Sequence, residues 1–356
     1  MFQIKPLTIG DLVAKYPIIQ GGMGVGISLS SLAGSVAKAG GVGIISAAQI
    51  GYRDSDFQKE PLVSNLKAMQ EELKKAREIA PNGIIGFNIM VATKQYALYV
   101  KEAVKAGADL IISGAGLPIN LPELVKDSAT KIAPIVSSVK SAMVILKMWD
   151  RKYRRIPDLV VIEGPLAGGH LGFSPEQIEE YTSNESKYDD EIRRIIHLVK
   201  EYEETYQKGI PIVVGGGIYT NADFKRIMEL GADGVQVGTR FVTTKECDAP
   251  LNYKNTYINA EKADIVITKS PVGMPGRAIK NTFLETVSSG QKPPKKCYSC
   301  LGHCNPSTTP YCITEALINA VDGKLDEALL FCGSNAYRSK TIERVEDVIN
   351  DIVGEK

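Results

Sequence analysis

One histidine follows a buried apolar run, and it is the residue in this sequence best placed to do chemistry. The run Val160–Glu163 ends in a carboxylate, and the glycine-rich loop 164–169 leads from it to His170. Glycine lets the backbone approach a ligand closely, and imidazole is the side chain that titrates near neutral pH. The other two histidines lie elsewhere, His197 in a charged helical run and His303 among cysteines. His170 is therefore the candidate catalytic residue.

Two further apolar runs end in glycines of the kind that bind phosphate. Gly215–Gly217 follows one run, and Gly238 and Thr239 follow the next. Backbone N–H groups in such loops can turn toward an anion. A helix predicted to begin at Thr220 or Asn221 would add its positive N-terminus. Together these loops predict a phosphate site, and tight turns without a ligand are the alternative interpretation.

Four cysteines crowd into residues 297–312 with the spacing C-x2-C-x3-C-x7-C. They are Cys297, Cys300, Cys304 and Cys312. Four thiolates at such spacing can hold an iron–sulfur cluster or another metal. A structural zinc with His303 as a substitute ligand, and reduced thiols packed beneath the terminal helices, are the alternatives. Cys247 and Cys332 have no partner at a comparable spacing, so we expect both to be buried apolar residues.

Eight short apolar runs alternate with helix-like segments, which is typical of repeated βα units around a parallel sheet. The runs are Pro17–Gln20, Val42–Ser46, Ile84–Asn88, Asp109–Ser113, Pro134–Ser138, Leu159–Glu163, Pro211–Gly215 and Gly234–Gly238. Helices are predicted over Ser30–Lys38, Leu62–Ile79, Lys94–Lys105, Ser141–Tyr153, Tyr188–Tyr206 and Asn221–Leu230. Eight units close a sheet, so the sequence predicts the α/β class and a TIM (β/α)8 barrel.

The chain beyond the eighth run has a different pattern. Residues 261–296 show no clean period and contain four prolines, so we expect an extended excursion there. Helices are predicted over Ile313–Val321, Asp326–Cys332 and Val345–Val353. We therefore divide the chain into a barrel over 1–260 and a region over 261–356. The second region comprises the excursion, the cysteine cluster and a small helical appendage packed on the barrel.

Composition excludes several classes of partner. Lysine plus arginine total 42 against 41 for aspartate plus glutamate, and this balance gives no electrostatic footprint for nucleic acid or an anionic membrane. No apolar segment approaches the length that crosses a bilayer. The N-terminus lacks the apolar core of a signal peptide. We expect a cytoplasmic protein that acts on a small molecule. A homodimer is the assembly that we consider.

Two other barrel chemistries fit the strand ends poorly. A Schiff-base aldolase needs a lysine in the barrel mouth, and the one candidate, Lys140, more naturally starts the helix at Ser141. A metal-dependent hydrolase needs several acidic residues or histidines at strand ends. One histidine and one glutamate, His170 and Glu163, are too few.

The motifs in combination resemble the nitronate monooxygenase family, formerly called 2-nitropropane dioxygenases. The same family includes the flavin-type, or type II, enoyl-acyl-carrier-protein reductases. The resemblance covers about residues 10–285 and rests on the segments Gln20–Met23, Ala167–His170, Val214–Ile218 and Gly231–Phe241, in this order and spacing.

The resemblance implies a barrel that binds FMN without a covalent link. The flavin phosphate would lie on Gly216, Gly217, Gly238 and Thr239, and the isoalloxazine ring against Gly22, Met23 and Asn88. The remaining residues expected to contact the cofactor are Ser138, Glu163, Gly169, Gly215 and Gln236. His170 would face the flavin as a base or as a group that orients the substrate. Glu163 could equally bond the flavin or anchor the glycine loop.

Two reactions and one non-catalytic role follow from the resemblance. The first is oxidation of alkyl nitronates with oxygen through the flavin. The second is NAD(P)H-dependent reduction of an enoyl thioester or a quinone. The third is a flavin protein for electron transfer or redox sensing, with the cysteine segment as its responsive element. Usual members of the family lack the cysteine segment. It is similar to the cluster motif of iron–sulfur flavoenzymes that reduce dienoyl thioesters. An iron–sulfur cluster there would favour a reductase.

Overall fold

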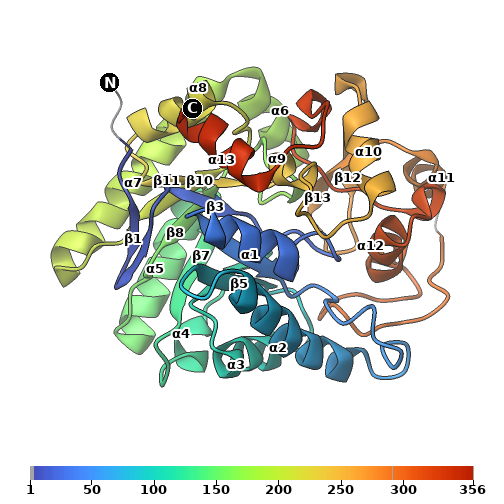
Figure 1. The fold of residues 1–356 in the computed structure, drawn as a ribbon, viewed down its shortest axis with the longest axis horizontal. Coiled ribbons are helices and arrows are strands. Elements are labelled where there is room, and N and C mark those ends of the chain that lie inside the picture. The colour runs from blue at the N-terminus through green and yellow to red at the C-terminus, as the bar shows by residue number, and fades with distance from the viewer. Residues whose placement is uncertain (1–3, 291, 356) are drawn as a thin grey trace.

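Eight parallel strands close into a barrel at the centre of the molecule (Figure 1). The computed structural model describes residues 4–290 and 292–355. The barrel strands are β3 (Ile18–Gln20), β4 (Val42–Ser46), β5 (Ile84–Met90), β6 (Leu110–Gly114), β7 (Lys131–Val136), β8 (Val160–Glu163), β10 (Ile212–Gly215) and β11 (Gly234–Val237). β11 pairs with β3 and so closes the ring. Each predicted run overlaps one of these strands, and the predicted TIM barrel is confirmed.

A helical layer surrounds the barrel and buries the outer faces of its strands. Its members are α1 (Ser30–Lys38), α2 (Pro61–Ile79), α3 (Tyr96–Ala106), α4 (Leu121–Leu124), α5 (Val139–Tyr153), α7 (Glu185–Tyr206), α8 (Asn221–Glu229), α9 (Thr239–Val242) and α10 (Leu251–Asn259). Thr220 caps α8, as one of the two predicted caps. Between the eighth strand and α10 the chain forms only the one-turn helix α9, because Pro250 delays the longer helix.

A hairpin that we did not predict covers the amino-terminal end of the barrel. It consists of β1 (Leu7–Ile9) and β2 (Leu12–Ala14). Leu7 and Ile9 are buried in one apolar cluster with barrel residues such as Val42 and Val213. The hairpin thus closes the end of the barrel that lies opposite the strand carboxyl ends.

The extended excursion expected over residues 261–296 contains regular elements that we did not predict. The segment contains the turn η1 (Lys262–Asp264), the strands β12 (Ile265–Lys269) and β13 (Pro275–Ile279), and α11 (Thr282–Ser289). β13 pairs antiparallel with β12 and with the two-residue strand β9, Gly169–His170. Each strand is too short to show a period by itself, and its partner lies far away in the sequence. α6 (Pro175–Ser183), which follows β9, was also not predicted.

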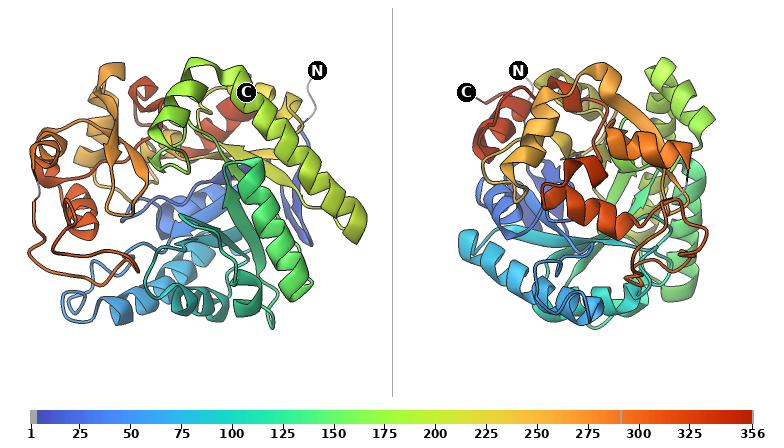
Figure 2. Two further views of the ribbon diagram at one scale, coloured as in Figure 1. Left: turned by 180° about the vertical axis from the view of Figure 1, so that it is seen from behind. Right: turned by 90° about the vertical axis from the view of Figure 1, so that its right-hand side faces the viewer.

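The C-terminal helices α12 (Ile313–Val321) and α13 (Val345–Val353) match the prediction. A helix over Asp326–Cys332 does not form, since only the turn η2 (Leu325–Glu327) is helical. The following residues are extended, because the Ile279 N–H donates to Leu330 and the Cys332 N–H donates to Arg277. A further turn, η3 (Ala336–Arg338), precedes α13. Figure 2 shows α12 and the loops around it, in orange and red, at one end of the barrel. α13 packs instead on the side of the barrel, against α8 and α1.

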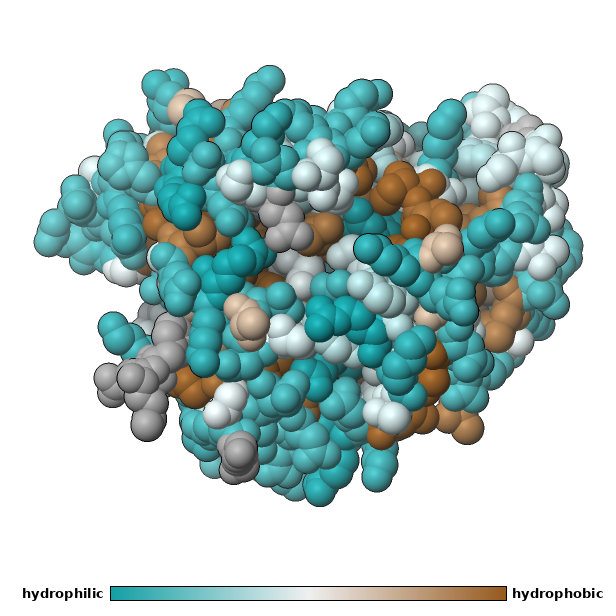
Figure 3. Space-filling model, turned by 90° about the horizontal axis from the view of Figure 1, so that it is seen from above, coloured by the Kyte–Doolittle hydropathy of each residue, from teal (hydrophilic) through white to brown (hydrophobic). Residues whose placement is uncertain are grey.

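The outer surface is mainly hydrophilic in the face shown in Figure 3, with apolar residues scattered between charged ones. Among the helices of the described ranges, none combines the length and the apolar character needed to cross a bilayer.

A glycine in β4 allows the tight contact between the barrel and α1. A Cβ atom added at Gly43 would lie 1.9 Å from the Ala33 carbonyl oxygen. Gly43→Ala should therefore destabilise the fold by about 3 kcal/mol, because backbone must move to make room. Thermal unfolding measures the effect. Gly209→Ala is the control, because the nearest atom to its Cβ would be 3.9 Å away, and a similar loss in both variants would contradict this account.

Candidate functional site

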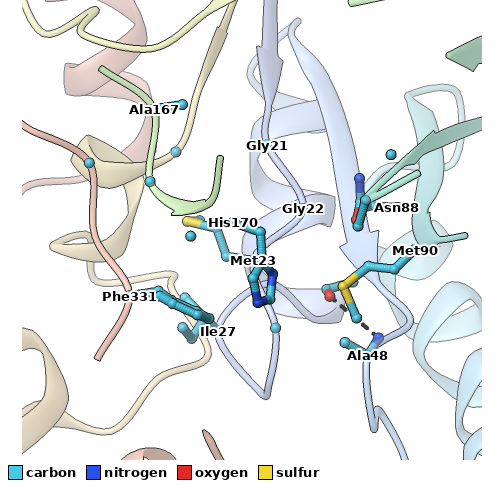
Figure 4. Close-up of a pocket in the computed structure, with 18 of the residues that line it drawn as sticks. Gly21, Gly22, Met23, Ile27, Ala48, Asn88, Met90, Ala167, His170 and Phe331 are labelled. Carbon is cyan, nitrogen blue, oxygen red and sulfur yellow. Dashed lines mark hydrogen bonds between the residues drawn. The ribbon is translucent and has the colours of Figure 1, made fainter. Parts of the chain in front are cut away.

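A cavity of about 260 Å³ opens at the carboxyl ends of the barrel strands. Its inner wall is formed by loops that follow the strands, and its outer wall by segments from residues 272–335. Figure 4 shows His170, Met23 and Phe331 on one side of this space, with Asn88 and Met90 across from them. The barrel and the C-terminal region therefore build the site together.

The loop after β3 approaches the end of β5 without a side chain between them. A Cβ at Gly22 would lie 2.3 Å from the Asn88 Cβ, so only glycine fits. Gln20 does not reach the cavity, because its Oε1 accepts the Ile44 N–H at 3.1 Å and ties β3 to β4. The Met23 N–H donates to Ser28 Oγ at 2.7 Å, which holds this methionine at the cavity.

Gly216 and Gly217 form a concave stretch of backbone after β10. Their φ angles are +106° and +78°, which L side chains rarely adopt. A Cβ at Gly216 would also lie 2.9 Å from the Ala167 nitrogen. In the part of the chain that the structure describes, no protein acceptor pairs with either amide N–H. These donors face the cavity and are available to an anion.

The tail completes this glycine cradle from the other side. The Gly333 N–H donates to Thr239 Oγ1 at 2.9 Å, and Asn335 Nδ2 donates to the Gly217 carbonyl at 2.7 Å. Gly333, Ser334 and Asn335 all line the cavity. These three residues were not predicted from the sequence, although a Gly-Ser-Asn triplet is a typical turn signal.

The N-terminus of α8 does not contribute to the cradle as predicted. The Asp223 carboxylate accepts the Tyr219 and Thr220 N–H groups at 3.0 and 2.8 Å. Asp223 thus occupies the position that an anion would take at this helix end, and neither Thr220 nor Asn221 lines the cavity. A helix that caps itself with an acidic residue has few free donors for a ligand.

No lysine or arginine lines the cavity within the described residues. Two buried guanidinium groups lie behind it and hold backbone instead. Arg277 donates to the Ala167 carbonyl, while Arg240 donates to the Tyr219 carbonyl and forms ion pairs with Glu343 and Asp351. An anion in the cavity would therefore be held by amide dipoles.

His170 is fixed by contacts on several sides. Its strand β9 pairs with β13, and its ring packs edge-on against Phe331 with the centroids 4.9 Å apart. His170 Nε2 lies 2.7 Å from Ser270 Oγ, which also accepts the Val272 N–H at 3.3 Å. The hydroxyl proton of Ser270 is then free to donate to Nε2, which would leave the ring proton on Nδ1. Burial lowers the pKa of His170 to about 4, so the imidazole is neutral at physiological pH.

Glu163, at the end of β8, faces the cavity with no partner for its carboxyl group among the described residues. Removal from water raises the pKa of this carboxyl to about 8. The neighbouring Tyr188 hydroxyl donates to the backbone carbonyl of Glu163 at 2.9 Å and leaves the side chain free. Glu163 is thus protonated near pH 7 and can donate one hydrogen bond into the cavity.

The structure gathers most of the predicted site residues around this cavity. Those that line it are Gly22, Met23, Asn88, Glu163, Gly169, His170, Gly215, Gly216, Gly217, Gln236, Gly238 and Thr239. Ser138 is the exception, because its hydroxyl accepts the Ser141 N–H and caps α5 away from the cavity. A serine just before a helix more often caps that helix than it binds a ligand.

The predicted metal site is not supported. Within residues 4–290 and 292–355 no group of three or more His, Cys, Asp or Glu side chains could hold a metal ion. Cys297, Cys300, Cys304 and Cys312 are free thiols. Their spacing indicated ligands, but Cys297 is exposed while Cys300 packs inward against an apolar cluster. Cys247 and Cys332 are buried as expected.

The outer wall of the cavity contains apolar residues that the sequence analysis did not identify. They are Val272, Met274, Leu301, Ile313, Leu317 and Phe331. In the sequence they carry no sign of a site, since core residues look the same. Only the folding of 272–331 over the barrel mouth makes them part of the cavity wall.

A family model described as nitronate monooxygenase matches residues 5–355. A probable nitronate monooxygenase of Staphylococcus saprophyticus is 28% identical over 309 residues, which are 78% of this chain and 79% of the relative. One from Staphylococcus aureus strain JH9 is 27% identical over 313 residues, with the same coverage of both chains.

Two solved structures are similar in fold. FabK from Thermotoga maritima has a TM-score of 0.70 at 23% identity, covering 96% of this chain and 92% of its own. Nitroalkane oxidase from Streptomyces ansochromogenes has a TM-score of 0.71 at 18% identity, covering 96% of each chain.

The protonated Glu163 makes stability depend on pH. Between its ordinary pKa of 4.5 and about 8, this carboxyl keeps its proton in the folded protein and loses it on unfolding. The stability contributed by this group therefore falls as pH rises through that interval, by up to about 1.4 kcal/mol per pH unit. Glu163→Gln stays neutral and should lose this dependence. The melting temperature of the variant should thus rise relative to wild type from pH 5 to pH 8.

Both proteins are compared at matched ligand content. The His170 contribution runs the opposite way, with stability lost as pH falls from 6.5 toward 4, but it is present in both proteins and cancels. Parallel melting curves across this range would mean that Glu163 is ionised in the fold.

Proposed function

The chain belongs to the nitronate monooxygenase family, and from this premise we propose that it is an FMN-dependent oxidoreductase that oxidises alkyl nitronates with oxygen. The observation that carries the proposal is the neutral His170, held in place by Ser270, at a cavity that also presents backbone amide donors. No lysine or arginine lines this cavity among the described residues. Such a cavity suits a phosphate at one end and a small reacting group beside the imidazole at the other.

The residues present fit FMN. Among the described residues the amides of Gly216 and Gly217 have no protein acceptor, and a Cβ atom at either position would clash with the loop 164–167. Gly22 brings bare backbone against Asn88, where a flat ring can approach closely. Glu163 offers one unused hydrogen-bond donor to the hydroxyl or carbonyl groups of such a ligand. When bound there, FMN would supply the electron acceptor for the reaction.

His170 is better suited to orient a nitronate than to remove a proton from a nitroalkane. A base works best when its pKa lies near the working pH, and burial lowers the pKa of His170 to about 4. Its Nε2 is also engaged by Ser270. With the ring proton on Nδ1, the imidazole would donate to a nitro oxygen of a substrate that is already an anion. This favours the substrate-orienting role over the role of base.

A reductase of enoyl thioesters is the second candidate, and the apolar outer wall favours it. Leu301, Ile313 and Leu317 line the cavity beyond His170 and could contact an acyl chain. A nitronate with a small alkyl group would not need these apolar contacts. In this case NAD(P)H would supply the electrons, and His170 would hold the thioester carbonyl. A quinone would make similar contacts with the same wall.

An anaerobic flavin spectrum separates the candidates. The holoenzyme is titrated first with NADH and then with propionate 3-nitronate. Bleaching by the nitronate alone supports the monooxygenase, and bleaching by NADH supports a reductase. If neither compound bleaches the flavin, the non-catalytic flavin protein is favoured. A protein that takes up no FMN would rule out all three.

His170→Ala should slow flavin reduction by the nitronate about 100-fold, because the substrate is no longer oriented. FMN affinity should stay within about threefold of wild type, since the cradle is untouched. Stopped-flow absorbance measures the first quantity and flavin fluorescence the second. Ser270→Ala should give a smaller loss in the same step, because Ser270 acts on the substrate only through the imidazole. Unchanged kinetics in His170→Ala would remove this residue from the mechanism.

Leu317→Trp tests the reductase by filling the apolar wall. A long-chain enoyl thioester should react at least about tenfold more slowly, whereas a four-carbon thioester should change little. The control is Leu251→Trp, because Leu251 is 60% exposed and lies away from the cavity. Equal effects on both thioesters would indicate general damage to the site, and no effect on either would exclude an acyl chain from this wall.

A further inference from the structure

The cysteine segment forms part of the cavity rim. The Lys94 N–H donates to the Cys300 carbonyl at 3.1 Å, and the Gly302 N–H donates to the Ala92 carbonyl at 2.9 Å. Thr93 and Leu301 form an antiparallel bridge between these two bonds. Residues 300–302 are therefore paired with the loop that follows β5. Any change in their backbone changes the wall that Cys300 and Leu301 form.

The segment is also anchored at the surface on its N-terminal side. The Tyr298 ring stacks on Phe57 with the centroids 5.7 Å apart, and its hydroxyl donates to Gln58 at 3.3 Å. This anchor leaves Cys297 exposed and its sulfur in contact with the Ser299 N–H. Cys300, three residues later, turns inward to the cavity.

Two of the thiols, Cys300 and Cys304, face the same apolar cluster. Both are partly buried against it, together with Leu301 and Ile313. The Thr314 side chain hydrogen-bonds the Cys300 sulfur, and both residues line the cavity. Burial, helped by the nearby Cys304 thiol, raises the pKa of the Cys300 thiol. The loop between the two cysteines contains Gly302, and the nearest atom to a Cβ there would be 3.8 Å away, so the loop has room to bend.

We propose that Cys300 and Cys304 are a thiol modification site at which a peroxide forms a disulfide, and that this disulfide reshapes the outer wall of the cavity. The site goes beyond the proposed flavin chemistry, since its formation needs only the protein and the oxidant. Disulfides that form in reducing compartments are usually transient and catalytic or redox-sensing.

The reaction balances in two steps with hydrogen peroxide. Cys304, which does not line the cavity, attacks one peroxide oxygen; the O–O bond breaks, and a sulfenic acid and one water form. The Cys300 sulfur then attacks the sulfenic sulfur, the S–O bond breaks, and a second water leaves with the Cys300 proton. Two thiols are oxidised by two electrons, and one peroxide is reduced to two waters. Cys300 takes the second step because its sulfur is engaged by Thr314 and lies at the cavity wall.

The disulfide would change the cavity through Cys300. Its sulfur would move toward Cys304 and away from Thr314, and Leu301 lies between the two cysteines in the chain. The bridge Thr93–Leu301 would then be strained or lost. The cradle at Gly216 and Gly217 lies on the barrel side of the cavity, and among the described residues neither glycine forms a backbone hydrogen bond with this segment. Access of a substrate to the outer wall should therefore change, while the amide cradle at Gly216 and Gly217 keeps its conformation.

Peptide mapping of the flavin-loaded protein tests the site directly. The protein is treated with hydrogen peroxide, its free thiols are alkylated, and the digest is analysed by mass spectrometry with and without dithiothreitol. We expect a Cys300–Cys304 bond in most molecules, reversed by dithiothreitol. A dominant bond of Cys300 with Cys297 or Cys312, only sulfinic or sulfonic acids, or unmodified thiols would each overturn the proposal.

A second measurement tests the effect on the cavity. In the wild type, peroxide should lower the rate of substrate-driven flavin reduction at least about threefold, reversibly with dithiothreitol, and leave FMN bound. Cys304→Ser should keep the untreated rate and lose the response. Cys297→Ser is the matched control, because this exposed thiol lies three residues from Cys300, one closer than Cys304, and should keep the response. Loss of the response in Cys297→Ser, or its persistence in Cys304→Ser, would contradict the assignment.

The two measurements separate this site from the proposed function. If no substrate reduces the flavin, the peptide map still decides whether the disulfide forms. If the flavin is reduced but the map shows no Cys300–Cys304 bond, the enzyme proposal stands and the thiol site fails.

Discussion

The pairing of two residues, Gly169 and His170, with β13 is the constraint on which the site depends. A glycine-rich loop after β8 would not hold an imidazole in one place by itself. The hydrogen bond from the Leu171 N–H to the Pro275 carbonyl, together with the β9–β13 register, makes this loop the edge of a three-stranded sheet. β13 is held in turn by the tail through Arg277 and Ile279. The position of His170 is thus determined by residues more than a hundred positions away.

The same region sets the electrostatic character of the cavity. Folding residues 272–335 over the barrel mouth removes His170 and Glu163 from water, and both then prefer their neutral forms. The arginines nearby are used to hold backbone carbonyls, so the described cavity presents neutral donors and amide dipoles. Such a site attracts an anion by directed hydrogen bonds, which select its shape as well as its charge.

The barrel and most of the inner wall could be predicted from the sequence because both are local. A strand such as Val42–Ser46 is a continuous apolar run, and glycines such as Gly216 mark positions that no other residue can occupy. The outer wall could not be predicted, because its short strands and its apolar residues gain a role only through contacts between distant segments. Ser138 and the α8 N-terminus show a second limit of prediction from sequence. A polar residue at the end of a strand can cap the following helix and then does not contact a ligand. The cysteine spacing indicated metal ligands, but Cys297 is exposed while Cys300 and Cys304 pack against an apolar cluster.

The antiparallel contact between β9 and β13 also bears on how the protein is made. A ribosome releases residues 160–237, the last three strands of the barrel, well before residues 275–335. During that interval a nascent chain can close the barrel while the loop that carries His170 has no partner. The cavity is therefore complete only when the residues up to Asn335 have been synthesised and have docked. Ligand binding at the cavity is then a late event, and chains cut short by premature termination would contain the barrel strands without the outer wall of the cavity.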